Sequence, residues 1–169
     1  MAKPIRVAVV EDDQEIRDLV RRILSEDSTI HFVKAYPSGD AFLKNFSGGE
    51  VDVVVMDINM PGSNGIECVA RAKPLNPQVQ YIISTVFENP NYIFQALCAG
   101  ATGYLLKSLS AQELIPAIHG VMEGGSPMSP AIARLVVSSF QGQARASISD
   151  HQLTAREREV VDGLAAGLM

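Results

Sequence analysis

Hydrophobic residues along this chain form two kinds of pattern, short continuous runs and longer stretches with helical spacing. The runs are rich in β-branched residues and cover residues 5–10, 31–36, 53–56, 81–85 and 103–106. Runs of this length and composition predict buried strands. The clearest helical stripe lies between the first two runs and consists of Ile16, Leu19, Val20, Ile23 and Leu24.

Further helices are expected between and after the remaining runs. Capping residues, prolines and glycines mark them at about 39–46, 65–73, 90–100 and 110–122. The last one opens with Ser110 and Glu113, the spacing of a capping box, but contains Pro116, which should remove a hydrogen bond and bend the helix. Regular alternation of strand and helix predicts an α/β fold, with a parallel sheet covered by helices on both faces.

The pattern changes after residue 124, which we take as the end of the main domain, residues 1–124. Ser129 and Pro130 then form a helix start, and a hydrophobic stripe that runs to Phe140 predicts a linker helix. Residues 141–152 are polar and small, as expected for a flexible tether, so residues 125–152 are interpreted as linker helix and tether.

A new unit is expected over residues 153–169. Thr154 and Glu157 have capping-box spacing, and a helical stripe leads to Gly167, which suits a C-terminal cap. A lone helix of about a dozen residues is marginal in water, so this segment makes sense as the opening of a longer unit.

Composition narrows the functional classes. The chain has 169 residues, 47% of them hydrophobic, which suffices for one ordinary domain of about 100–150 residues and an appendage. Membrane insertion and secretion are not expected, because no run approaches the roughly 18 apolar residues of a membrane span. Cys68 and Cys98 lack metal-site spacing and are interpreted as core thiols in the reducing cytoplasm. A net charge of -5 lacks the basic footprint of a complete DNA-binding protein.

Residues that can carry chemistry stand at the ends of the predicted strands. Glu11 and Asp12 follow the first strand, Asp57 the third and Lys107 the fifth, while Thr85 ends the fourth. Ligands of open α/β sheets bind beyond the carboxyl ends of the strands, where the strand order reverses. If the first and third strands are neighbours, three carboxylates converge in one crevice with a hydroxyl and an ammonium group on its rim.

Such a set of carboxylates calls for a cation, because clustered carboxylates repel one another and raise one another's pKa. Mg²⁺ fits best, since it takes oxygen ligands, needs only one or two carboxylates and keeps several waters. With the ion bound, Asp57 can attack phosphorus as a nucleophile while Lys107 neutralises phosphoryl charge, which gives an acyl phosphate. Each residue alone is more often a solvated surface group, but all the expected types occur in the order that one fold requires.

The motifs that carry these residues resemble a known family. They are VVEDD at 9–13, VVVMDINMPGSNGIE at 53–67, IIST at 82–85 and AGATGYLLK at 99–107. Residues 4–123 thereby resemble the CheY-like receiver domain of two-component response regulators. The resemblance implies a flavodoxin-like, doubly wound (βα)5 fold with strand order 2-1-3-4-5 and a protein that is not a conventional enzyme, since a receiver catalyses only its own phosphorylation and dephosphorylation.

The resemblance also implies a role for each residue. Asp57 matches the phosphoacceptor and Asp12 the direct Mg²⁺ ligand. Glu11 matches the second acidic residue, and Asn59 the position whose backbone carbonyl completes the metal shell.

Three further positions follow from the same resemblance. Thr85 matches the switch hydroxyl, Tyr104 the switch aromatic residue and Lys107 the phosphate-binding lysine. Many receivers have a cis proline after this lysine, whereas Ser108 stands here, so a trans peptide bond is expected.

The C-terminal part resembles the NarL/FixJ subfamily, whose LuxR-type helix-turn-helix matches LTAREREVVDGLAAGL at 153–168. We expect a C-terminally truncated regulator that contains the first helix of this incomplete DNA-binding domain. The implied partners are a sensor histidine kinase, DNA in the full-length protein only, and a second copy on phosphorylation. The alternative is a receiver that acts only through protein–protein interaction. A haloacid-dehalogenase-like phosphatase is disfavoured, because EDDQE at 11–15 lacks its Asp-x-Asp-x-Thr motif.

Overall fold

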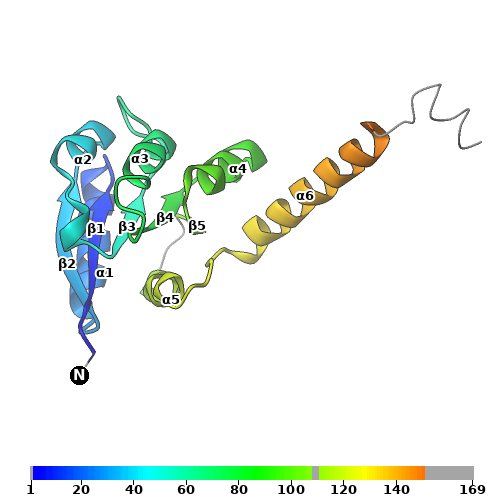
Figure 1. The fold of residues 1–169 in the computed structure, drawn as a ribbon. Coiled ribbons are helices and arrows are strands. Elements are labelled where there is room, and N and C mark those ends of the chain that lie inside the picture. Colours follow the sequence, from blue (N-terminus) through cyan, green and yellow to red (C-terminus); the bar gives the residue numbers. More distant parts are fainter. Residues whose placement is uncertain (1, 108–110, 151–169) are drawn as a thin grey trace, which may run out of the picture. The chain divides into compact units, whose positions relative to one another are not determined.

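Strands and helices alternate along the chain in the computed structural model, which describes residues 2–107 and 111–150 and side chains as far as residue 145 (Figure 1). The strands are β1 (Ile5–Val10), β2 (Ile30–Tyr36), β3 (Val53–Met56), β4 (Gln80–Thr85) and β5 (Gly103–Leu106). The helices are α1 (Gln14–Glu26), α2 (Gly39–Asn45), α3 (Gly65–Ala72), α4 (Pro90–Ala99), α5 (Ala111–Met122) and α6 (Pro130–Asp150), with a short 3-10 turn, η1 (Gly48–Glu50). The predicted elements are confirmed to within one or two residues for all five runs and for the helices before residue 122.

The strands form a parallel sheet in the order β2-β1-β3-β4-β5, as predicted. Helices α1 and α5 cover one face, where their hydrophobic residues pack with alternate residues of the strands. Helices α2, α3 and α4 follow one another across the other side (Figure 1). The fold is therefore the doubly wound, flavodoxin-like arrangement, in which the chain reverses its direction of winding at β1.

Burial explains why the hydrophobic runs became strands. All four residues of β3, Val53–Met56, are buried because both faces of this central strand are covered. The edge strand β2 alternates more freely between buried and exposed positions. On α1, Val20 and Leu24 are buried, whereas Leu19 of the predicted stripe is 46% exposed and lies at the margin of the covered face.

Helix starts are set by side-chain caps in the loops after the strands. The carboxylate of Asp13 accepts from the backbone N–H groups of Glu15 and Ile16 and so begins α1 directly behind β1. Asn64 and Glu67 form a capping box at the start of α3. Short loops with fixed helix starts hold the residues at the strand ends in defined positions.

The expectations for the C-terminal part need a correction. The residues from Gln141 were predicted as a flexible tether, but α6 continues through Asp150, because Gln, Ala and Arg favour helix and no proline interrupts the segment. The chain divides into two units, residues 1–134 and 135–169, with the division inside α6. The expected helix-turn-helix start at 153–169, the Ser110 cap and the Lys107–Ser108 bond lie outside the described residues.

Two smaller expectations are resolved in the receiver-like unit. Cys68 is buried as predicted, but Cys98 is exposed because α4 turns Ile93 and Ala96 inward and leaves position 98 on another side. Helix α5 runs from Ala111 to Met122 with Pro116 inside it.

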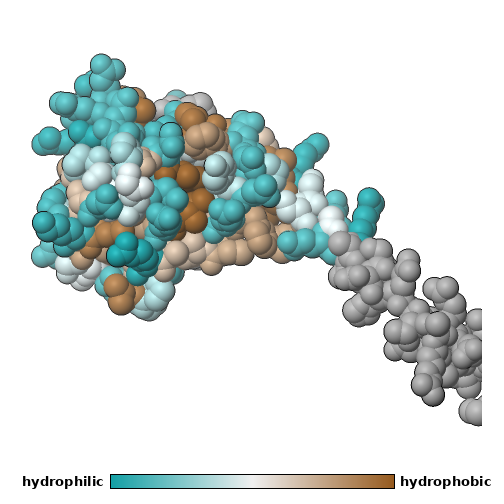
Figure 2. All heavy atoms as spheres, turned by 90° about the horizontal axis from the view of Figure 1, so that it is seen from above, coloured by the Kyte–Doolittle hydropathy of each residue, from teal (hydrophilic) through white to brown (hydrophobic). Residues whose placement is uncertain are grey.

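The face seen in Figure 2 carries many hydrophilic residues, with hydrophobic residues exposed between them. Within the described residues no helix is both long and apolar enough to cross a membrane.

Close backbone packing behind Asp57 gives a testable consequence. A Cβ on Gly65 would overlap the carbonyl oxygen of Asp57, whereas a Cβ on Gly120 of α5 would meet no atom within 4 Å. We expect Gly65→Ala to lower the free energy of unfolding by about 1–3 kcal/mol, since rigid backbone must move. Gly120→Ala, the matched control, should raise it by about 0.5–1 kcal/mol. Urea denaturation measures both, and equal effects would contradict this packing.

Candidate functional site

The register of the sheet brings two acidic residues to the same level. Val10 of β1 pairs with Met56 of β3, so Glu11 and Asp57 are the next residues on adjacent strands. The ladder extends into them, because the N–H of Asp57 donates to the carbonyl of Val10 at 2.9 Å. Both side chains therefore leave neighbouring strand ends at the point where the winding reverses.

Three carboxylates meet there. Each of Glu11, Asp12 and Asp57 offers an oxygen atom, and these atoms all lie within 4.8 Å of one another. Glu11 and Asp57 are 4% and 5% exposed, whereas Asp12 is exposed at the entrance. Two buried carboxylates and one accessible carboxylate match the oxygen donors that Mg²⁺ takes.

Lys107 approaches the three carboxylates from the edge strand β5. It follows β5, and its Nζ lies 2.7 Å from Oε2 of Glu11 and 3.1 Å from Oδ2 of Asp57. The side chain thus passes the end of β4, to which its own backbone is tied by a bond from the Lys107 N–H to the carbonyl of Thr85. Lys107, Glu11, Asp57 and Ser84 form the polar side of a cavity of about 70 Å³ beneath α1.

Burial dominates the protonation of this cluster. Burial raises the pKa of Glu11 and of Asp57, and Lys107 offsets only part of that effect. Burial also pulls the pKa of Lys107 down, but its contacts with the two carboxylates more than compensate, so its pKa is raised. The site thus holds a permanent cation beside carboxylates that lack full solvation, and a divalent cation would relieve them.

Backbone N–H groups complete the surroundings of Asp57. The N–H of Ile58 donates to Oδ1 of Asp57 at 2.8 Å, and the N–H of Asn59 also lowers the pKa of this carboxyl. The loop that carries them is held from α2, where the Asp40 carboxylate accepts from the backbone N–H and the hydroxyl of Ser63. The nucleophile candidate therefore has one oxygen held by the backbone and the other by Lys107.

The two predicted switch residues are linked through the loop after β4. Thr85 is fully buried, and its hydroxyl accepts from the N–H of Phe87 at 3.4 Å. Tyr104 is also fully buried, and its hydroxyl donates to the carbonyl of Phe87 at 2.8 Å. Burial raises the pKa of Tyr104 to about 12, so it remains a donor. Both side chains thus form hydrogen bonds with the backbone of one residue, Phe87.

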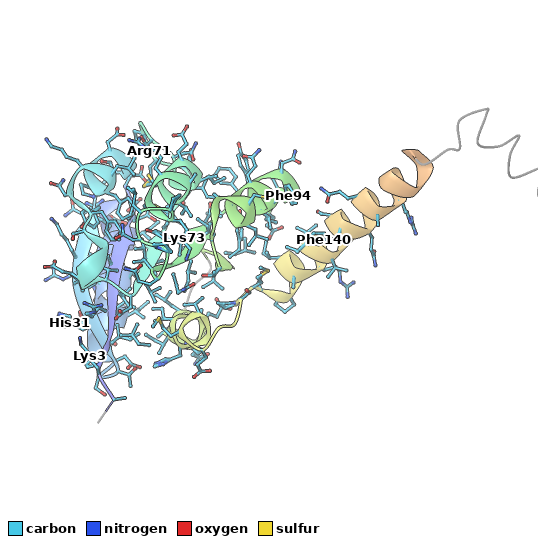
Figure 3. All side chains as sticks on the ribbon, viewed as in Figure 1. Lys3, His31, Arg71, Lys73, Phe94 and Phe140 are labelled. Atoms are coloured by element: carbon cyan, nitrogen blue, oxygen red, sulfur yellow. The ribbon has the colours of Figure 1, made fainter. Side chains whose placement is uncertain are left out.

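The structure brings Glu11, Asp12, Asp57 and Lys107 together and places Asn59 beside them through its backbone. Sequence patterns did not single out Arg17, whose guanidinium bonds to the backbone of the acidic loop. The histidines lie elsewhere: His31 is exposed on β2 (Figure 3), and His119 Nε2 lies 2.9 Å from the Thr29 hydroxyl. His151 lies outside the described residues.

Comparisons with known proteins agree with this geometry. The family description that matches the chain is the response regulator receiver domain, over residues 7–119. The transcriptional regulatory protein UhpA of Escherichia coli is 34% identical over 164 residues, which cover 97% of this chain and 78% of UhpA. The response regulator GacA of Pseudomonas viridiflava is 34% identical over 157 residues, which cover 92% of this chain and 73% of GacA.

Solved structures are similar as well. A LuxR-family two-component response regulator from Aurantimonas matches with a TM-score of 0.75 and 27% identity, covering 82% of this chain and 99% of that one. The receiver domain of the response regulator NarL from Mycobacterium tuberculosis matches with a TM-score of 0.69 and 28% identity, covering 73% of this chain and 99% of that one.

The raised pKa of Asp57 predicts a pH-dependent stability. Because the folded state binds this proton more tightly than the unfolded state, ionised Asp57 destabilises the fold, and stability is lost as pH rises through its folded pKa. In EDTA at pH 8 we expect Asp57→Asn to unfold at a higher temperature than wild type.

The gain should shrink as the pH falls and Asp57 becomes protonated in both states. The exposed residue Asp18 of α1 supplies the control, Asp18→Asn, which should show no such gain. Thermal unfolding from about pH 3 to pH 8, a range that includes the ordinary Asp pKa near 4, measures the difference. A gain that is absent or independent of pH over this range would refute the assignment of the shift to burial.

Proposed function

The chain belongs to the response regulator receiver family, and from this premise we propose that it accepts a phosphoryl group on Asp57 in a reaction that requires Mg²⁺. The observation that carries the proposal is the position of Lys107, whose ammonium group contacts both Glu11 and Asp57 at the ends of adjacent strands. A phosphoacceptor needs this pairing of a held carboxylate with a fixed cation.

Glu11, Asp12 and Asp57 would hold the metal ion, together with the backbone carbonyl of Asn59. The three side chains fit this purpose because their oxygen atoms converge and the entrance is exposed at Asp12. When bound, Mg²⁺ supplies charge neutralisation for the phosphoryl oxygens.

Asp57 acts as the nucleophile. One carboxylate oxygen forms a bond to phosphorus while the bond from phosphorus to the donor's leaving atom breaks, so the product is an aspartyl phosphate and the dephosphorylated donor. Lys107 already lies 3.1 Å from Oδ2 of Asp57 and can move its contact from the carboxylate to a phosphoryl oxygen without leaving the site. The Ile58 N–H holds Oδ1 and restricts rotation of the side chain.

The signal leaves the site through Thr85 and Tyr104. The Thr85 hydroxyl accepts a long hydrogen bond of 3.4 Å from the Phe87 N–H, and it can donate its own proton to a phosphoryl oxygen. Both hydroxyls contact the backbone of Phe87, so movement of Thr85 alters the loop that leads into α4. Such a local change biases the surface formed by α4, β5 and α5 between two states.

The partners follow from the family. A kinase supplies the phosphoryl group in response regulator systems, and we propose a sensor histidine kinase in the cytoplasm for this chain. UhpA is by its name a transcriptional regulatory protein, which supports a proposed role in transcription through a helix-turn-helix that residues 153–169 would begin, with dimerisation on phosphorylation. A receiver that acts only through protein contacts would show phosphorylation without DNA binding.

Intact mass spectrometry tests the proposal. Incubation with acetyl phosphate and Mg²⁺ should add one phosphoryl group to wild type and to the control Asp18→Asn, but none to Asp57→Asn, because Asp57 provides the only proposed acceptor oxygen. EDTA should abolish the addition. A phosphoryl group that persists in Asp57→Asn would contradict the proposal.

A further inference from the structure

We propose that Arg17 is a positioning residue of the metal site, whose guanidinium group holds the backbone of Glu11 and Asp12 and thereby fixes their carboxylates. This inference rests on the proposed function, since it concerns the binding of Mg²⁺ by these residues.

Arg17 engages three consecutive carbonyl groups of the acidic loop. Its Nη1 lies 2.8 Å from the carbonyl oxygen of Glu11 and 2.7 Å from that of Asp12. A guanidinium nitrogen of this type carries two N–H bonds, so each carbonyl can accept one of them. The backbone N–H of Arg17 donates to the carbonyl of Asp13 at 3.0 Å. Arg17 thus holds the carbonyl groups of residues 11–13 through hydrogen bonds from its side chain and its backbone N–H.

The exposed metal ligand depends most on this contact. Glu11 is also held by a bond from its N–H to the carbonyl of Tyr36 and by the Asp13 N–H, which donates to its carboxylate. Asp12 is exposed, and among the described residues its own backbone atoms make one hydrogen bond, which its carbonyl oxygen accepts from Arg17. Removal of Arg17 would therefore free Asp12 more than Glu11.

Helix stability does not explain an arginine at this place. Arg17 is the fourth residue of α1, and a cation near a helix N-terminus opposes the helix dipole. Its side chain turns back toward the loop before the helix, and it is half-buried there. The favourable contacts are those with the loop, which points to a role in shaping the loop.

The sign of the effect separates positioning from electrostatics. A guanidinium group near a metal site repels the metal ion, so loss of its charge alone would strengthen Mg²⁺ binding. Loss of positioning has the opposite effect, because groups that orient the ligands of a metal contribute about 10–100-fold to its affinity. Weaker binding on removal of a nearby cation is therefore specific to positioning.

The experiment compares Arg17→Met, which keeps an unbranched apolar stem, with Arg22→Met, which removes an exposed arginine of the same helix. Isothermal titration calorimetry of the metal-free protein with MgCl₂ gives the Kd, and thermal unfolding in EDTA reports the stability of each variant. We expect Arg17→Met to raise the Kd for Mg²⁺ about tenfold or more and Arg22→Met to leave it unchanged. Arg17→Lys, which keeps the charge but not the planar donor, should fall between wild type and Arg17→Met, and it serves as the test variant should Arg17→Met not fold.

The outcomes distinguish the two proposals. Wild-type protein that does not bind Mg²⁺ would overturn the proposed function itself. Wild-type protein that binds Mg²⁺, with an unchanged or lower Kd in both Arg17 variants, would overturn the positioning role and leave the proposed function standing.

Discussion

The contact of one ammonium group with two buried carboxylates is the interaction on which this structure's chemistry depends. Glu11 and Asp57 are almost inaccessible to water, and burial raises the pKa of both. Lys107 opposes this effect, because its ammonium group lowers the pKa of both carboxyls through hydrogen bonds and charge. The lysine favours the ionised form of both carboxylates, and the exposed Asp12 lies on the accessible side of the cluster.

The fold supplies this contact through strand order. Because β1 lies between β2 and β3, Glu11 and Asp57 become neighbours although they are 46 positions apart in the sequence. Lys107 follows β5, so its side chain needs only to span the end of β4 to reach them. The packing around the site keeps its backbone rigid: Gly65 lies against the carbonyl of Asp57, and the loop before it is tied to Asp40. Rigid placement lets a small change at Asp57 reach Phe87 through Thr85 and Tyr104.

Sequence patterns predicted the sheet and the acidic cluster because both depend on residue type at strand ends. The β-branched run 53–56 predicted a buried strand that ends at Asp57, and the structure confirms that all four of its residues are buried. Sequence patterns gave wrong predictions where contacts in the folded protein determine burial or secondary structure. Cys98 has the same helical surroundings as Cys68 yet is exposed, and the segment from Gln141 is helical despite its polar composition. Arg17 was missed because its partners are backbone carbonyls, which leave no mark in the sequence.

The central claim is that Glu11, Asp12 and Asp57 surround one divalent cation beside Lys107. Anomalous diffraction from crystals soaked in MnCl₂, with Mn²⁺ in place of Mg²⁺, tests it directly. The account predicts a strong anomalous peak within bonding distance of the Asp12 and Asp57 carboxylates, with the Lys107 ammonium group still facing Asp57. The absence of a peak there, or a Lys107 side chain turned away from Asp57, would contradict it.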